Sequence, residues 1–116
     1  FLLEPNIKLS NQFLLHIITS ISIFKTLLKI NIKNISIKWP NDIYVNNKKI
    51  AGILIENLVY RKFIHKSVIG VGLNINQVNF SSLNATSIIN ETMKKHNLNQ
   101  IIQIFKSIFN NIIIQN

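Results

Sequence analysis

The sequence predicts an α+β fold, in which helices pack against a mixed, mostly antiparallel β-sheet. Two stretches near the ends of the chain, 13–28 and 101–113, repeat apolar residues at helical spacing. Between them, residues 35–75 form several short apolar runs separated by turn residues. Short turns between neighbouring strands indicate antiparallel pairing. The 116 residues contain no Pro- or Ser-rich linker and no internal repeat, so 1–116 is expected to be one domain or part of one.

The N-terminal residues predict a strand end and then a helix. Phe1–Leu3 is typical of the end of a strand that stops near Pro5. Ser10 or Asn11 is suited to cap a helix that starts just after it. The most apolar window, 13–30, is interrupted by polar residues and lacks the roughly 20 near-continuous apolar residues of a membrane span. The expected buried face of this helix consists of Phe13, Leu14, Ile17, Ile18, Ile21, Phe24 and Leu28.

The central strands are delimited by proline and asparagine. Apolar and polar residues alternate from Ile35 to Trp39, which predicts a half-buried strand that ends at Pro40. Residues 43–45 form a short second strand, and Asn46-Asn47 is suited to a tight hairpin turn because Asn tolerates positive φ. The next strand, Lys48–Leu58, is expected to be buried on both faces around 50–55.

The second half of the chain continues this pattern and ends in another helix. Tyr60–His65 is expected to connect two strands of a hairpin, and Ser67–Ile75 to form another buried strand. Gln77–Asn84 reads as a loop, whereas Thr86–Met93 fits either a short strand or turn followed by a helical turn. The apolar face of the last helix is expected to consist of Ile101, Ile102, Phe105, Ile108, Phe109, Ile112 and Ile113.

Charge and cysteine content limit the classes of function. Thirteen Lys and Arg against four Asp and Glu give a net charge of +9, which indicates an anionic partner such as nucleic acid, a membrane surface or a phosphate-bearing ligand. The lysines are scattered, so a generally basic surface without such a partner is an alternative. The absence of cysteine excludes a disulfide scaffold, a thiolate metal site and a Cys nucleophile. No signal peptide is evident, and we expect a cytoplasmic protein.

Residues suited to chemistry gather between 38 and 76. Asn41 and Asp42 follow a strand that ends at a proline, where polar groups often face a ligand, although a self-satisfied turn would look the same. Lys49 is adjacent to buried residues and could offer its ammonium to a phosphate or carboxylate; a solvated hairpin lysine is the alternative. Gly52 lies three positions further on, so it shares a face with Lys49 only if a bulge or twist intervenes.

Gly70 and Gly72 lie two positions apart and therefore leave the same strand face without side chains, which permits close approach of a ligand or another backbone. They are not followed by a helix, so they do not form a dinucleotide fingerprint, and no Walker A motif is present. No residues have the spacing of a protein-held zinc site. Any Mg²⁺ is expected to arrive with a nucleotide and to touch Asp42 or Glu56 at most.

Three ordered motifs closely resemble biotin–protein ligase, also called biotin–[acetyl-CoA-carboxylase] ligase. They are KWPND at 38–42, KKIAGILIE at 48–56 and GVGLN at 70–74. NATS at 84–87 and FLLEP at 1–5 also fit the family pattern, so the resemblance covers essentially the whole chain. It implies the class II synthetase-like catalytic domain of biotin and lipoate ligases.

The resemblance implies a two-step ligase. Biotin and ATP, with Mg²⁺, would give biotinyl-5′-AMP and pyrophosphate, and the biotinyl group would pass to a lysine of the biotin carboxyl carrier protein domain of acetyl-CoA carboxylase. Lys49 matches the essential lysine of the family, whose ammonium would neutralise charge between the biotin carboxylate and the α-phosphate. Asn41 and Asp42 match the pair that contacts nucleotide and metal-bound phosphate. Gly52 matches the glycine against biotin, and Asn74 the asparagine near the adenylate.

The remaining motif residues are expected to shape the pocket. Trp39 and Pro40 would wall it, and Gly70 and Gly72 would leave room for the ligand, whereas Glu56 is assigned a structural role or that of a distant ion-pair partner. The family's upstream Gly/Arg-rich loop and its C-terminal domain have no counterpart in 1–116, and nothing matches an N-terminal DNA-binding module. We therefore expect a partial catalytic domain that alone binds biotin poorly and turns over slowly or not at all.

Three other interpretations compete with this one. A lipoate-type protein ligase has a similar fold and adenylation chemistry, but the KWPND run argues against it. A basic nucleic-acid-binding module would use the +9 charge, but Arg is scarce and the aromatic residues fit a core. A catalytically silent relic that keeps the fold stays open.

Overall fold

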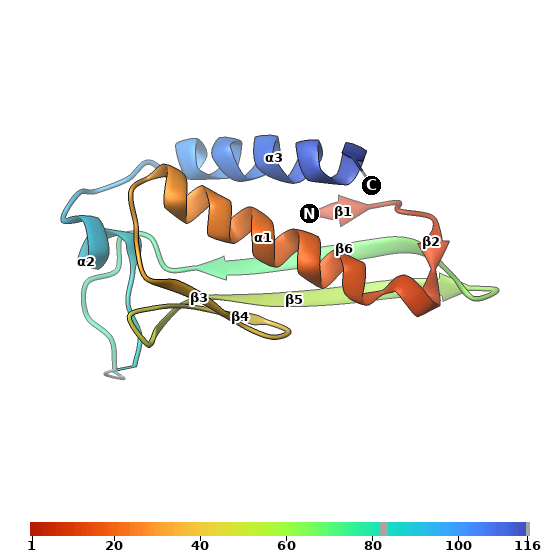
Figure 1. Cartoon of the computed structure of the whole chain (residues 1–116), viewed down its shortest axis with the longest axis horizontal. Coiled ribbons are helices and arrows are strands. Elements are labelled where there is room, and N and C mark those ends of the chain that lie inside the picture. Colours follow the sequence, from red (N-terminus) through yellow and green to blue (C-terminus); the bar gives the residue numbers. More distant parts are fainter. Residues whose placement is uncertain (82–83, 116) are drawn as a thin grey trace.

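The computed structural model describes residues 1–81 and 84–115 and confirms the α+β class (Figure 1). One sheet has the strand order β1-β6-β5-β4-β3, with β2 also paired to β6, and each of these pairs is antiparallel. Its strands are β1 (Leu2–Leu3), β2 (Ile7–Lys8), β3 (Ile35–Lys38), β4 (Asp42–Val45), β5 (Lys48–Tyr60) and β6 (Phe63–Leu73).

Two long helices cover one face of this sheet. A 3-10 turn, η1 (Leu9–Asn11), leads into α1 (Phe13–Lys29), and α3 (Leu98–Gln115) lies alongside α1 on the same side (Figure 1). The helical turn predicted within Thr86–Met93 is present as α2 (Ile88–Thr92). The Ser87 hydroxyl caps it by accepting a hydrogen bond from the Asn90 amide. No helix in the described ranges covers the opposite face, which we call the open face (Figure 1).

The hairpin turns follow local residue preferences in one case and depart from them in the other. Asn46 and Asn47 have φ values of 49° and 65°, which confirms the predicted tight turn between β4 and β5. The β5–β6 connection is shorter than predicted, because only Arg61 and Lys62, with φ values of 50° and 67°, lie between the strands. The strands therefore continue to the tip of the hairpin.

The core lies between the helices and the covered face of the sheet. A larger cluster joins α1, β4, β5 and the start of α3, and a smaller one joins Ile18, Ile69 and Phe109 further along the same layer. The larger cluster consists of Ile23, Leu27, Ile32, Ile43, Val45, Ile50, Ala51, Ile53, Ile88 and Ile101. The burial of Ile101 and Phe109 confirms these two members of the predicted apolar face of the C-terminal helix, whereas Ile102, also predicted to belong to it, is exposed.

Three predicted burial patterns are wrong because the helices cover only one face. β5 is not buried on both faces through 50–55, since Leu54 is 64% exposed. β6 is half-buried, with Ile69 in the core and Val68 exposed. The alternating stretch 35–39 lies at the sheet edge, where Ile37 and Trp39 are exposed instead of half-buried.

The predicted start and buried face of α1 are also wrong. Gln12 occupies the N-cap without a side-chain hydrogen bond, and the chain enters the helix through η1 instead of a Ser10 or Asn11 cap. Phe13, Ile17 and Leu28 are exposed, although Ile18 is buried as predicted.

The buried side of α1 carries hydroxyl residues because the helix contacts both the sheet and α3. Thr19, Ser22 and Thr26 are buried, and each hydroxyl donates a hydrogen bond of 2.7 Å to the carbonyl four residues earlier. These bonds remove the cost of burying a polar group. Hydropathy spacing alone does not identify such a face.

The stretch Leu9–Lys29 is long and apolar enough to cross a membrane by length and composition alone, with a mean hydropathy of 1.2 in its most apolar window. In that window 44% is buried inside the fold, where α1 forms the central core helix. Its apolar character is therefore accounted for by packing against the sheet and α3.

Candidate functional site

A β-bulge places Lys49 on the open face of the sheet. Ala51 pairs with Ile43 and Lys49 pairs with Tyr44, so Ile50 is an extra residue in β5. The extra residue breaks the alternation of side chains: Ile50 and Ala51 both reach the core, and Lys49 lies on the same side as Gly52. The bulge that the sequence analysis required for Lys49 and Gly52 to share one face is thus present.

The backbone of the bulge is held by a segment that is distant in sequence. The Lys49 amide donates to the Asn84 carbonyl at 2.7 Å, and the Lys49 carbonyl accepts from the Thr86 amide at 2.9 Å. The Ile50 carbonyl accepts from the Asn74 amide at 3.0 Å. The NATS run and the residue after β6 therefore hold the backbone of the bulge on the side of β5 that faces β6.

Lys49 and Asp42 form an ion pair, with 3.1 Å between Nζ and Oδ1. Their side chains are 46% and 38% exposed, so the pair is open to solvent and to an incoming ligand. The lysine stem crosses Gly52: a Cβ placed on that glycine would lie 3.5 Å from both Cε and Nζ of Lys49. A side chain at position 52 would thus occupy the space beside the ammonium.

The glycines form a floor without side chains. Gly52 pairs with Gly72, and Gly70 pairs with Leu54 in the next row. A Cβ on Gly70 or Gly72 would meet only a backbone oxygen, at 3.7 Å and 4.0 Å respectively. A broad hollow of about 510 Å³ lies over this floor, lined by Asn41, Asp42, Lys49, Gly52, Ile53, Leu54, Gly70, Val71 and Gly72.

A second hollow of about 300 Å³ adjoins the first. It is lined by Lys49, Ala51, Gly52, Gly72, Asn74 and Ala85. Lys49, Gly52 and Gly72 line both hollows, so Asn41 lies on one side of the lysine and Asn74 on the other. The predicted site residues are thus neighbours around Lys49, although no single hollow is lined by all of them.

The two asparagines differ in how their side chains are satisfied. Asn74 Nδ2 donates to the Thr86 carbonyl at 3.1 Å, which ties β6 to the segment that holds the bulge. Asn41 accepts from the Ile53 amide at 2.8 Å through its main-chain carbonyl, but its Oδ1 is buried without a hydrogen-bond partner in the described part of the chain. A buried polar atom without a partner is costly, and this one has almost no surface open to solvent.

Trp39 and Pro40 do not line either hollow. The Trp39 ring is 53% exposed and lies 5.8 Å from Phe13 and 6.1 Å from His16 of α1, measured between ring centroids. Their predicted role as pocket walls remains a prediction. Glu56 is exposed on β5, and within residues 1–81 and 84–115 no cation lies within 4.0 Å of it.

The sequence interpretation missed two members of the open face. Leu54 lines the larger hollow, and its position could have been found by counting two residues on from Gly52 along the strand. Tyr44 pairs with Lys49 across β4 and β5 and lies under the Lys38 ammonium. Tyr44 could have been found in the sequence because it lies two residues after Asp42 and therefore shares a strand face with it.

A metal site built from protein ligands is not found in the described ranges, where no three His, Cys, Asp or Glu side chains gather. Asp42 is the one carboxylate that lines either hollow, and it pairs with Lys49. These residues therefore fit a cation that arrives already coordinated by phosphate oxygens better than one held by the protein alone.

Known proteins of similar sequence match parts of this chain. The bifunctional ligase/repressor BirA of Bacillus subtilis is 33% identical over 76 residues, a match covering 66% of this chain and 23% of that protein. Biotin–protein ligase 1, chloroplastic, of Arabidopsis thaliana is 50% identical over 42 residues, which is 36% of this chain and 11% of that protein. The matches thus cover only small parts of these relatives.

Solved structures match nearly the whole chain. The apo biotin protein ligase of Aquifex aeolicus superposes with a TM-score of 0.78 at 28% identity, over 96% of this chain and 49% of that one. The same ligase in complex with biotin and ATP gives a TM-score of 0.77 at 25% identity, over 99% and 48%. This chain therefore spans about half the length of these solved relatives.

The model of the Biotin/lipoate A/B protein ligase family matches residues 1–74, which include β1 to β6 and all three glycines of the floor. This match covers more than half of the 116 residues. The chain therefore belongs to the biotin/lipoate A/B protein ligase family.

Proposed function

We propose that this chain carries the adenylation centre of a biotin–protein ligase. In the proposed reaction, biotin and ATP give biotinyl-5′-AMP and pyrophosphate, and the biotinyl group then passes to a lysine of a biotin carboxyl carrier protein domain, such as that of acetyl-CoA carboxylase. The Aquifex aeolicus relative has been solved with biotin and ATP, and the Leishmania major biotin protein ligase, at 23% identity, with biotinyl-5-AMP. These ligands support the choice of substrates for a chain of the same fold.

The observation that carries the proposal is the placement of Lys49 beside a bare floor. Its ammonium lies above Gly52 and faces the hollow that Gly70 and Gly72 leave open. A carboxylate and a phosphate brought together here repel each other, and one fixed ammonium between them lowers that repulsion most where charge builds up in the transition state. Asp42 holds the ammonium in place at 3.1 Å before the substrates bind.

Each proposed step assigns a defined task to this site. In the first, an oxygen of the biotin carboxylate attacks the α-phosphorus, and the bond to the β-phosphate breaks with its electron pair leaving on pyrophosphate. In the second, the amine of the carrier lysine attacks the acyl carbon and AMP leaves. Lys49 would stabilise the charged phosphate oxygens in both steps, and Asn41, which lines the larger hollow, would contact the nucleotide. Mg²⁺ bound with ATP would neutralise further phosphate charge beside Asp42.

Two further expectations belong to the proposal. Because the chain spans about half of its solved relatives, we expect it to form the adenylate slowly or not at all alone. A clear burst of biotinyl-5′-AMP from the 116-residue chain would contradict this expectation. We also propose that the protein acts in the cytoplasm, which localisation of a tagged protein in cells would test.

In the central experiment, this chain replaces the segment that it matches in the Aquifex aeolicus ligase. The product is a chimeric ligase, whose transfer of biotin to a carrier domain is measured. Lys49→Ala should lower transfer by at least about 100-fold, since loss of one preorganised group facing developing charge costs about 10²–10³ in rate. Lys48→Ala removes the same charge from the neighbouring residue, which lines neither hollow, and should leave transfer near its original rate.

Three outcomes would count against the proposal. One is transfer near the original rate after Lys49→Ala, and another is an equal loss from both lysine variants. The third is a preference for lipoate over biotin as the activated acid, which would favour a lipoate-type ligase of the same family. Circular dichroism of each variant shows whether the fold is kept.

A further inference from the structure

A row of cross-strand neighbours crosses the open face from the glycine floor to the sheet edge. Lys38 pairs with Asp42, Asp42 pairs with Gly52, and Gly52 pairs with Gly72. Directly opposed residues point to the same face of a sheet, so Lys38 shares the open face with the Asp42–Lys49 pair. Since neighbouring strands lie about 4.8 Å apart, the Lys38 backbone lies one strand beyond Asp42 on the side away from the floor.

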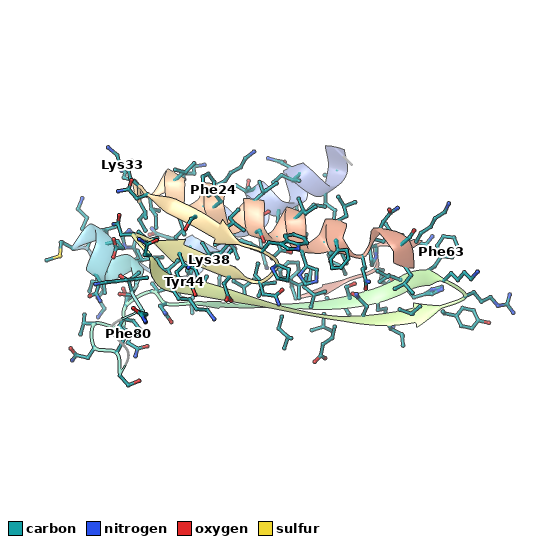
Figure 2. All side chains as sticks on the ribbon, turned by 60° about the horizontal axis from the view of Figure 1, so that its bottom comes forward. Phe24, Lys33, Lys38, Tyr44, Phe63 and Phe80 are labelled. Carbon is teal, nitrogen blue, oxygen red and sulfur yellow. The ribbon has the colours of Figure 1, made fainter. Side chains whose placement is uncertain are left out.

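An aromatic ring holds the Lys38 ammonium toward the site. Nζ of Lys38 lies 4.0 Å from the centroid of the Tyr44 ring, and the two side chains lie together on the sheet (Figure 2). Tyr44 is the cross-strand partner of Lys49. The cation–π contact therefore directs Lys38 toward the row that contains Lys49 instead of leaving it free in solvent.

This part of the open face has a surplus positive charge. Asp42 is paired with Lys49, whereas in the described residues no carboxylate lies within 4.0 Å of the Lys38 ammonium. Two ammonium groups and one carboxylate thus lie in this part of the open face, and together they carry a net charge of +1. An anion that contacts both lysines would balance that charge.

We infer that Lys38 is a second phosphate-binding residue, which binds the β- and γ-phosphates that leave as pyrophosphate. The inference rests on the proposed adenylation. When the carboxylate oxygen attacks the α-phosphorus, the bond to the β-phosphate breaks on the opposite side, and its electrons go to the departing pyrophosphate. One cation is needed near the α-phosphate and another near the leaving group; Lys49 at the floor and Lys38 toward the edge are placed in that order.

Pyrophosphate binding to the 116-residue chain tests the inference without requiring turnover. Isothermal titration calorimetry should give a dissociation constant about tenfold higher for Lys38→Ala than for the unchanged chain. Lys38→Arg keeps the charge and the contact with Tyr44 and should restore most of the affinity. Lys33→Ala is the matched control, because Lys33 is an exposed lysine in the turn before β3, away from Lys38 and Tyr44 (Figure 2). Tyr44→Leu, which removes the ring, should weaken binding in the same direction as Lys38→Ala.

The outcomes separate this inference from the proposed function. Equal losses from Lys38→Ala and Lys33→Ala would reduce the effect to general charge and overturn the inference, as would an unchanged chain that binds no pyrophosphate. Two results together would uphold the phosphate site and reject biotin activation. The first is pyrophosphate binding that depends on Lys38. The second is a chimeric ligase that shows no biotin-dependent exchange of label between pyrophosphate and ATP. In an active chimera, Lys38→Ala should slow this exchange about tenfold or more and spare transfer from added biotinyl-5′-AMP.

Discussion

Gly52→Ala should make the protein slightly more stable and its biotin site markedly weaker. The added Cβ would meet Lys49 at 3.5 Å and Asp42 Oδ1 at 3.9 Å, which are ordinary contact distances. No described glycine has positive φ, so alanine suits the backbone at this position. Alanine in place of a strand glycine is worth about 0.4–1 kcal/mol of stability through the entropy of the unfolded chain. We expect urea unfolding to show a gain of that size.

The same methyl group would occupy the floor on which the ligand is proposed to lie. Forcing one extra carbon into a filled space costs about 1–3 kcal/mol, so the biotin dissociation constant should rise about 5- to 140-fold. Calorimetric titration of the chimeric ligase with biotin measures this change. Gly70→Ala makes the same chemical change one row further from Lys49, where only Leu54 O lies near, and should weaken binding less. Reduced stability or unchanged affinity after Gly52→Ala would refute the reasoning.

Two more predictions concern the packing that supports the site. Ser67 is buried, and its hydroxyl donates a hydrogen bond to Asn57 Oδ1 at 2.6 Å. Ser67→Ala should therefore lower the free energy of unfolding, measured in urea, by about 1–3 kcal/mol. Val68→Ala, on the exposed side of the strand, is the control and should change it by no more than about 0.5 kcal/mol. Asn74→Ala removes the bond to the Thr86 carbonyl and should speed hydrogen exchange of the Thr86 amide several-fold; exchange at the unchanged rate would show that the backbone bonds to Lys49 suffice.

The antiparallel pairing of the consecutive strands β3 to β6 and the tight Asn46-Asn47 turn could be predicted because both depend on residues close together in sequence, whereas the pairing of β1 and β2 with β6 could not. The buried face of α1 could not, since it depends on which neighbours the helix meets. Thr19 and Ser22 are polar by composition, yet they are buried because their hydroxyls are satisfied within the helix. The predicted two-sided burial of β5 failed for the same reason: whether Leu54 is covered depends on elements far away in the chain.

The site residues were identified through motif resemblance, but their meeting on one face depends on a single extra residue. In a regular strand, Lys49 and Gly52, three positions apart, would point to opposite faces. The bulge at Ile50 puts Ile50 and Ala51 into the core one after the other and returns Lys49 to the glycine side. A sheet covered on one face can bury two consecutive residues of a strand only through such a bulge. The spacing of Lys49 and Gly52 is therefore a property of the bulged strand, and a ligand site here requires the bonds from Asn74 and 84–86 that hold the bulge.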